Sequence, residues 1–274
     1  MGNEVIKSQA AITGVQPKLS LHIKDGSKDA PQRFTVVGLW GGYILKPPTK
    51  QYAHLPEIED VTMHLAELSG ITTVPHSLIR LRSGNLAYIT KRVDRNGGKK
   101  LHMEDMCQIT ERLTEHKYNG SHEQIAKAIL KYSSAPGLDV VNYFEQVVFS
   151  FLTGNADMHL KNFSLLKDPV MGYTLCPAYD MVATALVVDN DSEELALNLN
   201  GKKRKLQRKD FITAMQLSKI PDKAIENVFK KFELTVPDWP RFIKTSFLPE
   251  KIQGSFIELI EQKANQLGFS EKNI

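Results

Sequence analysis

The stretch from Gly154 to Asn162 places an aspartate, a histidine, a lysine and an asparagine within nine residues. It follows an apolar segment with helical spacing and precedes a short pattern typical of a strand. Burying polar groups between two such elements costs free energy unless the groups are hydrogen-bonded or serve a function. A carboxylate can accept the proton of an attacking hydroxyl, and an amide oxygen is a suitable ligand for Mg²⁺. The alternative is that Asp157 is an ordinary turn or capping residue.

The spacing of Asp157 and Asn162 favours the chemical interpretation. Asp-x-x-x-x-Asn is similar to the catalytic loop of protein kinases, in which the aspartate accepts the hydroxyl proton and the asparagine binds magnesium. A second carboxylate, Asp180, follows two short strands that we expect over residues 163–166 and 173–176. Because such a hairpin returns the chain, we expect Asp180 to lie near Asn162 and to complete a magnesium site with nucleotide phosphates.

Lys46 ends an apolar strand segment, where a lysine usually extends to solvent. The functional interpretation is a lysine that binds nucleotide phosphates, a role that requires a glutamate on the following helix. Glu59, at the start of that predicted helix, is the expected partner, and Glu57 and Asp60 are competing candidates. The loop around Gly14 has one glycine, so it is neither a Walker loop nor a Gly-x-Gly-x-x-Gly element.

Two different sequence patterns, one alternating and one helical, surround these residues. Alternating patterns predict a small antiparallel sheet, with strands over 19–23, 33–37, 43–46, 77–81 and 86–90 and a helix over 59–69. Beyond Arg95 the periodicity is mainly helical, for example over 121–133 and 140–153. We therefore expect an α+β fold with a β-rich N-terminal lobe (residues 1–93) and a helical C-terminal lobe (residues 94–274).

Composition limits the class of protein. The 274 residues are 42% hydrophobic and 24% charged, which is typical of a globular chain, and the net charge of +4 is too small for a dedicated nucleic-acid binder. Two cysteines cannot build a disulfide framework or a four-ligand zinc site. No apolar stretch is long enough to span a bilayer and no signal pattern opens the chain, so we expect a cytoplasmic protein without membrane contact. A secretion signal of another kind would escape this test.

Taken in order, these segments resemble the HipA-like serine/threonine kinases, the toxins of bacterial HipBA and HipBST toxin–antitoxin systems. The resemblance runs from about residue 12 to residue 210 and is carried by Gly14-Val-Gln-Pro-Lys-Leu19, Ile44-Leu-Lys46, Leu55-Pro-Glu-Ile-Glu59, Glu104-Asp-Met-Cys-Gln108, Lys117-Tyr-Asn-Gly120, Gly154-Asn-Ala-Asp-Met-His-Leu-Lys-Asn-Phe-Ser164, Tyr179-Asp180 and Leu195-Ala-Leu-Asn-Leu-Asn-Gly201.

The resemblance implies a two-lobed, protein-kinase-like fold that uses ATP and Mg²⁺. It implies a toxin that phosphorylates a serine of an aminoacyl-tRNA synthetase and so inhibits translation. Relatives carry a further N-terminal subdomain before the Gly14 loop, which suggests the short HipT-like arrangement. The expected partners are then a small HipS-like neutralising protein and a HipB-like DNA-binding antitoxin.

Carried over by position, the resemblance assigns a role to each motif residue. Asp157 is similar to the catalytic base, Asn162 and Asp180 to the magnesium ligands, and Lys46 to the phosphate-binding lysine paired with Glu59. The further expected positions are His159 and Lys161 beside the γ-phosphate, the backbone of Lys91 and Val93 at the adenine, and Thr13 and Gly14 in a loop that contacts ATP. A purely structural role for His159 has equal support.

The chain departs from the family pattern at two places. The family's Glu-Arg-Phe-Asp-Arg reads here as Lys91-Arg-Val-Asp-Arg95, which leaves only the backbone contacts to adenine. Ala11 stands where the family carries an autophosphorylation serine. Either Thr13 is the regulatory acceptor, or control by autophosphorylation is weakened, or Ala11 is an engineered replacement.

Two other functions compete with a toxin kinase. One is an inactive kinase-fold module that only binds partners, and the other is a small-molecule kinase that shares the Asp-x-x-x-x-Asn spacing. The basic run at 201–209 could contact tRNA held by a synthetase, although a solvated loop is the simpler interpretation. We expect no strong direct binding of nucleic acid.

Overall fold

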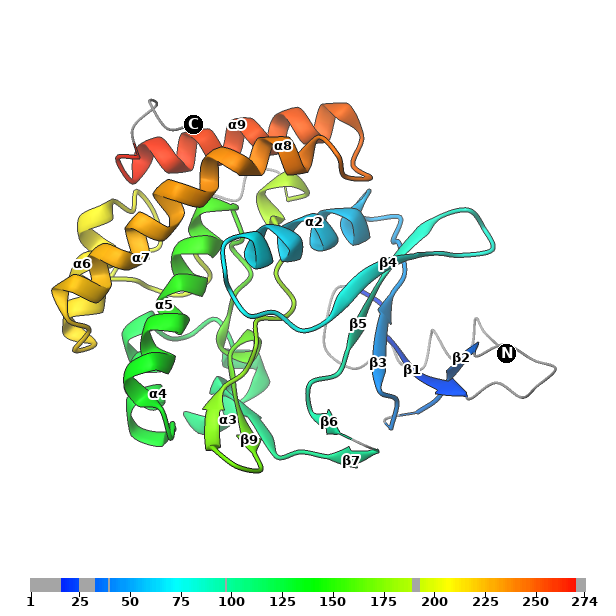
Figure 1. Ribbon diagram of the computed structural model, residues 1–274, viewed down its shortest axis with the longest axis horizontal. Coiled ribbons are helices and arrows are strands. Elements are labelled where there is room, and N and C mark those ends of the chain that lie inside the picture. The colour runs from blue at the N-terminus through cyan, green and yellow to red at the C-terminus, as the bar shows by residue number, and fades with distance from the viewer. Residues whose placement is uncertain (1–15, 25–32, 39, 97, 189–192, 270–274) are drawn as a thin grey trace. The chain divides into compact units, whose positions relative to one another are not determined.

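The computed structural model describes residues 16–24, 33–38, 40–96, 98–188 and 193–269 (Figure 1). The chain divides into two compact units. The first consists of Met1–Asp60 and Val74–Lys100, and the second consists of Val61–Thr73 and Leu101–Ile274. In the described part of the chain, the helices are too short or too polar to cross a bilayer.

The first unit is built on a five-stranded antiparallel sheet in the order β2-β1-β3-β5-β4. Strand alternation places Leu21, Leu45, Ala87 and Ile89 in one buried cluster, which is the core of this sheet. The predicted strands are confirmed to within one residue at each end. The strands are β1 (Leu19–Lys24), β2 (Arg33–Val36), β3 (Tyr43–Lys46), β4 (His76–Arg80) and β5 (Leu86–Lys91).

Helix α2 (Leu55–Leu68) begins four residues before its predicted start at residue 59. Pro56 lies in its first turn, where a proline is tolerated because the first backbone N–H groups of a helix have no partner within it. The boundary between the two units falls within this helix. A short hairpin of β6 (Arg95–Asn96) and β7 (Lys99–Lys100) ends the first unit.

Helix α5 (Pro136–Leu152) forms the centre of the second unit (Figure 1). Around it lie α4 (His122–Tyr132), α7 (Asp222–Thr235) and α9 (Glu250–Gln266). Its predicted start at residue 140 was four residues late, because Pro136 opens the helix in the first position. Its aromatic side chains pack edge-on against other helices, as for Phe149 with Trp239 and Phe151 with Phe211. This packing makes α5 the rigid element that ends at the candidate loop.

A small three-stranded sheet, in the order β10-β9-β8, lies in the same unit. The predicted hairpin is confirmed as β9 (Ser164–Asp168) and β10 (Gly172–Leu175), while β8 (Met103–Asp105) is an addition that the sequence patterns did not reveal. The remaining elements are α3 (Met106–Ile109), η1 (Thr114–His116), η2 (Leu160–Asn162), η3 (Thr184–Leu186), α6 (Arg208–Leu217), η4 (Val236–Asp238) and α8 (Trp239–Ile243).

Gly154 determines how the chain leaves α5. Its φ of +64° lies in the left-handed region, which is unfavourable for residues with a Cβ. A Cβ built here would lie 2.8 Å from Leu259 Cδ2 and 2.9 Å from Ala185 Cβ, closer than real contacts allow. The tight exit from the helix therefore requires glycine.

We predict that Gly154→Ala lowers the free energy of unfolding by about 2 kcal/mol or more, through the left-handed backbone and the overlap with two side chains. Gly137→Ala, in the first turn of the same helix, meets nothing within 4 Å and is the matched control. The control should be neutral or stabilising by up to about 1 kcal/mol. Urea unfolding of both variants tests this, and equal stabilities would contradict it.

Candidate active site

The polar residues of the 154–162 stretch form one closed loop between α5 and β9. The side-chain amide of Asn162 donates a hydrogen bond to the backbone carbonyl of Asp157 at 2.9 Å, and the Asp157 N–H donates to Asn155 Oδ1 at 3.2 Å. Asn162 is buried. Because its amide nitrogen is used to close the loop, the amide oxygen is the atom that can meet a ligand.

The segment before Asp180 is bonded to the end of this loop. The backbone N–H of Cys176 donates to the carbonyl of Ser164 at 2.9 Å, which continues the β9–β10 hairpin. The hydroxyl of the half-buried Tyr179 donates to the Lys161 carbonyl at 3.1 Å and lies 2.6 Å from the Ser164 hydroxyl. The hairpin thus returns the chain to the loop, as the sequence predicted.

The segment after Asp180 is bonded to the beginning of the same loop. The N–H of Ala156 donates to Thr184 Oγ1 at 2.9 Å, and the N–H of Ala185 donates to the Gly154 carbonyl at 3.0 Å. Asp180 itself has a φ of +59°, a left-handed conformation that aspartate tolerates better than most residues. Such backbone strain is typical of functional sites, and here it is held from both sides.

Asn162 and Asp180 together offer an amide oxygen and a carboxylate, both hard oxygen ligands. Mg²⁺ prefers oxygen ligands and binds through one or two carboxylates together with substrate phosphates and water. The donors therefore match the chemistry of that ion.

His159 lies in the loop as a buried and uncharged ring. Burial lowers its pKa and the nearby charge of Lys117 adds to this, against the raising effects of Asp157 and Asp180, so the imidazole is neutral at pH 7. Its Nδ1 is buried and has no hydrogen-bond partner within the described ranges. A water or ligand oxygen would satisfy that atom.

Lys161 forms an ion pair with Asp105 at 2.8 Å. Asp105 also caps α3, because its other carboxylate oxygen accepts the Gln108 N–H at 3.0 Å. The expected phosphate-side lysine is therefore held by the segment that begins α3.

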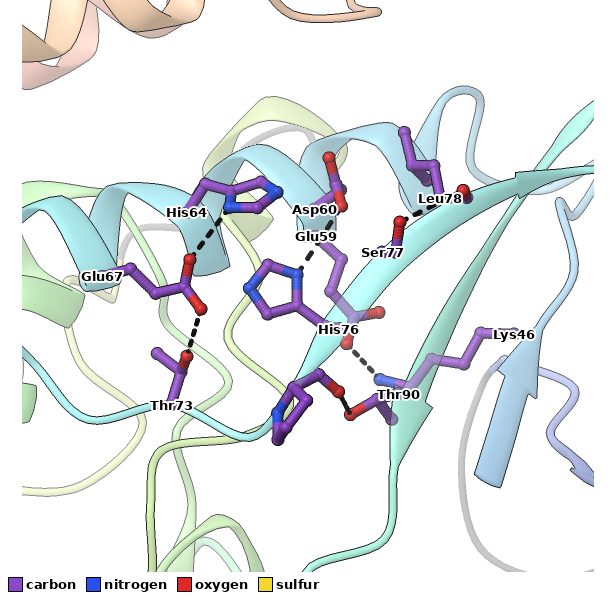
Figure 2. Close-up of polar contacts among 11 residues, drawn as sticks. Lys46, Glu59, Asp60, His64, Glu67, Thr73, His76, Ser77, Leu78 and Thr90 are labelled. Carbon is purple, nitrogen blue, oxygen red and sulfur yellow. Dashed lines mark hydrogen bonds and ion pairs between the residues drawn. The ribbon is translucent and has the colours of Figure 1, made fainter. Parts of the chain in front are cut away.

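In the first unit, Lys46 and Glu59 form a buried ion pair (Figure 2). Only 3% of Lys46 and none of Glu59 is exposed, and the Lys46 ammonium lies 5.5 Å from the centre of the Tyr88 ring. The expected pairing across thirteen residues is thus confirmed. A buried pair of this kind needs strong mutual interaction, since each charge loses water on burial.

The two competing carboxylates have other partners. Glu57 lies 3.6 Å from His54 Nδ1. Asp60 lies 3.6 Å from His76 Nδ1, as Figure 2 shows. Glu59 is therefore the carboxylate of α2 that pairs with Lys46 in the described structure.

The turn that follows β5 is fixed by its own charges. Asp94 accepts hydrogen bonds from Arg92 at 3.0 and 2.9 Å and pairs with Arg95. Burial raises the pKa of Asp94, but the bonds and charges of Arg92 and Arg95 outweigh it and lower the pKa below the ordinary value. Of the expected adenine-side backbone positions, Lys91 is the last residue of β5 and Val93 lies in this turn.

Ala11, Thr13 and Gly14 lie outside the described residues, so the expected loop with the phosphate contact and the regulatory acceptor stays a prediction.

Several basic residues of the run at 201–209 form ion pairs with acidic residues. The ion pairs are Lys202 with Asp210 at 2.8 Å, Lys203 with Glu193 at 3.2 Å and Arg208 with Glu233 at 2.7 Å. Such pairing favours a solvated, internally neutralised surface over a phosphate-binding one.

Three side chains at the site had no assigned role in the sequence. Tyr118 donates a hydrogen bond to Asp157 Oδ1 at 2.5 Å, Tyr179 fastens the loop, and Asp105 pairs with Lys161. Each lies within a motif that carried the family resemblance, at Lys117-Tyr-Asn-Gly120, Tyr179-Asp180 and Glu104-Asp-Met-Cys-Gln108. Their position within these motifs was the sequence feature that could have identified the three residues.

Comparisons with known proteins identify a family and several relatives. The family described as HipA-like C-terminal domain matches residues 10–239. The Sinorhizobium fredii protein named "Putative kinase Y4dM" is 32% identical over 207 residues, covering 71% of this chain and 49% of the relative. The serine/threonine-protein kinase toxin HipA of Shewanella oneidensis is 28% identical over 214 residues, covering 71% of this chain and 47% of the toxin. The chain thus spans about half the length of these relatives.

Two solved structures share the fold. HipA from Shewanella oneidensis, in complex with HipB and operator DNA, superposes with a TM-score of 0.73 at 23% identity, covering 94% of this chain and 65% of that one. The Helicobacter pylori proinflammatory kinase CtkA gives a TM-score of 0.61 at 15% identity, covering 91% and 93%. The fold is α+β and kinase-like, as predicted.

We predict that Glu59→Ala lowers the free energy of unfolding by about 3 kcal/mol, because it removes the carboxylate partner of a buried ammonium. The double variant Lys46→Met with Glu59→Leu should recover most of this loss, since it removes both charges. Glu67→Ala, an exposed carboxylate on the same helix, is the control. Chemical unfolding measures all three, and a Glu59→Ala variant as stable as the control would refute the importance of the pair.

Proposed function

The chain belongs to the HipA-like C-terminal domain family, and we propose that it is a serine/threonine protein kinase that transfers the γ-phosphate of ATP to a protein hydroxyl. The main support is the closed loop that holds Asp157 and Asn162, with Asp180 on a segment bonded to both ends of it. A base and two oxygen ligands in such an arrangement suit phosphoryl transfer, which depends on positioning and charge neutralisation.

In the proposed reaction, Asp157 accepts the proton of the attacking serine hydroxyl. The serine oxygen then forms a bond to the γ-phosphorus, the bond from that phosphorus to the bridging oxygen breaks, and ADP leaves. Asn162 and Asp180 would hold Mg²⁺, which neutralises developing charge on the phosphates. Lys46, oriented by Glu59, would bind the phosphates of ATP.

The remaining expected positions have supporting roles in this proposal. Neutral His159 would donate a hydrogen bond to a γ-phosphate oxygen, and Lys161 would approach the same group while Asp105 limits its movement. The backbone of Lys91 and Val93 would hold the adenine. Thr13 and Gly14 would contact the phosphates, with Thr13, or a serine in place of Ala11, as the site of autophosphorylation.

We propose a toxin role with an aminoacyl-tRNA synthetase as the phosphorylated protein, acting in the cytoplasm to inhibit translation. The support is family membership together with the HipA relative, which is named as a toxin. That HipA was solved with HipB and operator DNA, so a HipB-like antitoxin is a proposed partner here. A small HipS-like neutralising protein is a further proposed partner, on the resemblance of the sequence motifs to the kinases of HipBST systems.

We predict that the chain labels a bacterial protein with phosphate from γ-labelled ATP, and that Asp157→Gln abolishes labelling by removing the base. The measurement is labelling in a bacterial lysate, with identification of labelled proteins by mass spectrometry. Asp238→Gln, an exposed position on η4, is the matched control and should label normally. Ala11→Ser, run in parallel, tests whether self-labelling depends on position 11.

The outcomes separate the competing functions. A labelled synthetase that disappears with Asp157→Gln supports the toxin kinase and names its target. Normal labelling by Asp157→Gln contradicts the assignment of the base. No labelling of protein, with ATP consumed only when small hydroxyl compounds are added, indicates a small-molecule kinase, and no consumption at all indicates a binding module.

A further inference from the structure

Tyr118 directs its hydroxyl at the proposed base although much of its side chain is exposed. The hydroxyl donates to Asp157 Oδ1 at 2.5 Å, across 39 residues of sequence. The residue is 41% exposed, so water is accessible to it as a competing partner. A hydrogen bond to an ionised carboxylate is stronger than one between neutral groups, which explains why the phenol is held there.

The segment that carries Tyr118 is fastened to the catalytic loop. The N–H of Leu160 donates to the Lys117 carbonyl at 3.1 Å, and the Asn119 N–H donates to the His116 carbonyl at 2.9 Å to close the turn after η1. The Tyr118 ring meets the His159 ring edge to face, with 5.0 Å between their centres. Backbone and ring contacts thus fix the phenol relative to the loop.

The backbone of Asp157 is fixed by other groups, but these do not orient its carboxylate. Asn162 and Asn155 bond only to the carbonyl and the N–H of Asp157. Rotation about the side-chain bonds would still move the carboxylate oxygens away from an approaching hydroxyl. Of the polar contacts described for the Asp157 carboxylate, the one that opposes this rotation is the bond from Tyr118.

We infer that Tyr118 is a positioning residue for phosphoryl transfer: its hydroxyl holds one oxygen of Asp157 so that the other faces the acceptor hydroxyl. This role rests on the proposed kinase function. The hydroxyl would increase the rate by orienting the base, since a base displaced by a small distance greatly slows a transfer reaction. In this role Tyr118 acts through Asp157, to which its hydroxyl donates.

Tyr118→Phe tests this role, because it removes the hydroxyl and keeps the ring against His159. Tyr132→Phe is the matched control: Tyr132 is 48% exposed in the same unit, and like Tyr118 it follows a lysine whose ammonium lies over its ring. Steady-state kinetics are measured with labelled ATP and dephosphorylated casein as acceptor, and ATP hydrolysis is followed with water as acceptor. The unfolding midpoint in urea is measured for each variant.

We expect Tyr118→Phe to lower kcat about tenfold, the loss of roughly one charged hydrogen bond, with the KM for ATP and the unfolding midpoint unchanged. Tyr132→Phe should match the wild type. In an Asp157→Asn background, Tyr118→Phe should cause no further loss, because the two side chains act as a unit.

Other results overturn the inference in distinguishable ways. If the wild type transfers phosphate and Tyr118→Phe is equally fast, Tyr118 has no role; if the variant is faster, the phenol obstructs the base instead of orienting it. A loss of kcat matched by a lower unfolding midpoint indicates a merely structural contact. A wild type without transfer or hydrolysis overturns the proposed function, and the role of Tyr118 with it.

Discussion

The hydrogen bond from the Asn162 amide to the Asp157 carbonyl is the constraint on which the site depends. It closes the loop between α5 and β9, so that a carboxylate and an amide oxygen five residues apart are held by one short piece of backbone. Neither side chain alone would be notable, because aspartate and asparagine are common in turns. Their arrangement becomes chemically useful because the loop that carries them has little freedom.

The rest of the second unit supports this loop from several sides. Helix α5, packed through its aromatic side chains, delivers the chain to Gly154, whose left-handed backbone allows the sharp exit. The hairpin and the Tyr179 hydroxyl fasten the far end of the loop, and Thr184 fastens the near end. Rigid support of this kind is what preorganised catalysis requires, because a base or ligand displaced by a small distance loses most of its effect.

The sequence predicted the features that have local patterns. Alternation located the strands of the first sheet and the hairpin, and kinase-like spacing linked Lys46 with Glu59. The starts of α2 and α5 were missed because proline in the first turn precedes the regular apolar spacing. The contact of Tyr118 with Asp157 could not be predicted, since it joins residues 39 apart and depends on how the turn after η1 packs on the loop.

The central claim is that this loop and Asp180 form a magnesium-dependent ATP site. Calorimetric titration of the chain with ATP, in excess Mg²⁺ and then in EDTA, tests it without any knowledge of the protein substrate. The account predicts that Mg²⁺ raises ATP affinity by about tenfold or more, and that the near-isosteric Asp180→Asn loses most of this gain. Equal ATP affinity with and without Mg²⁺ in the wild type would contradict it.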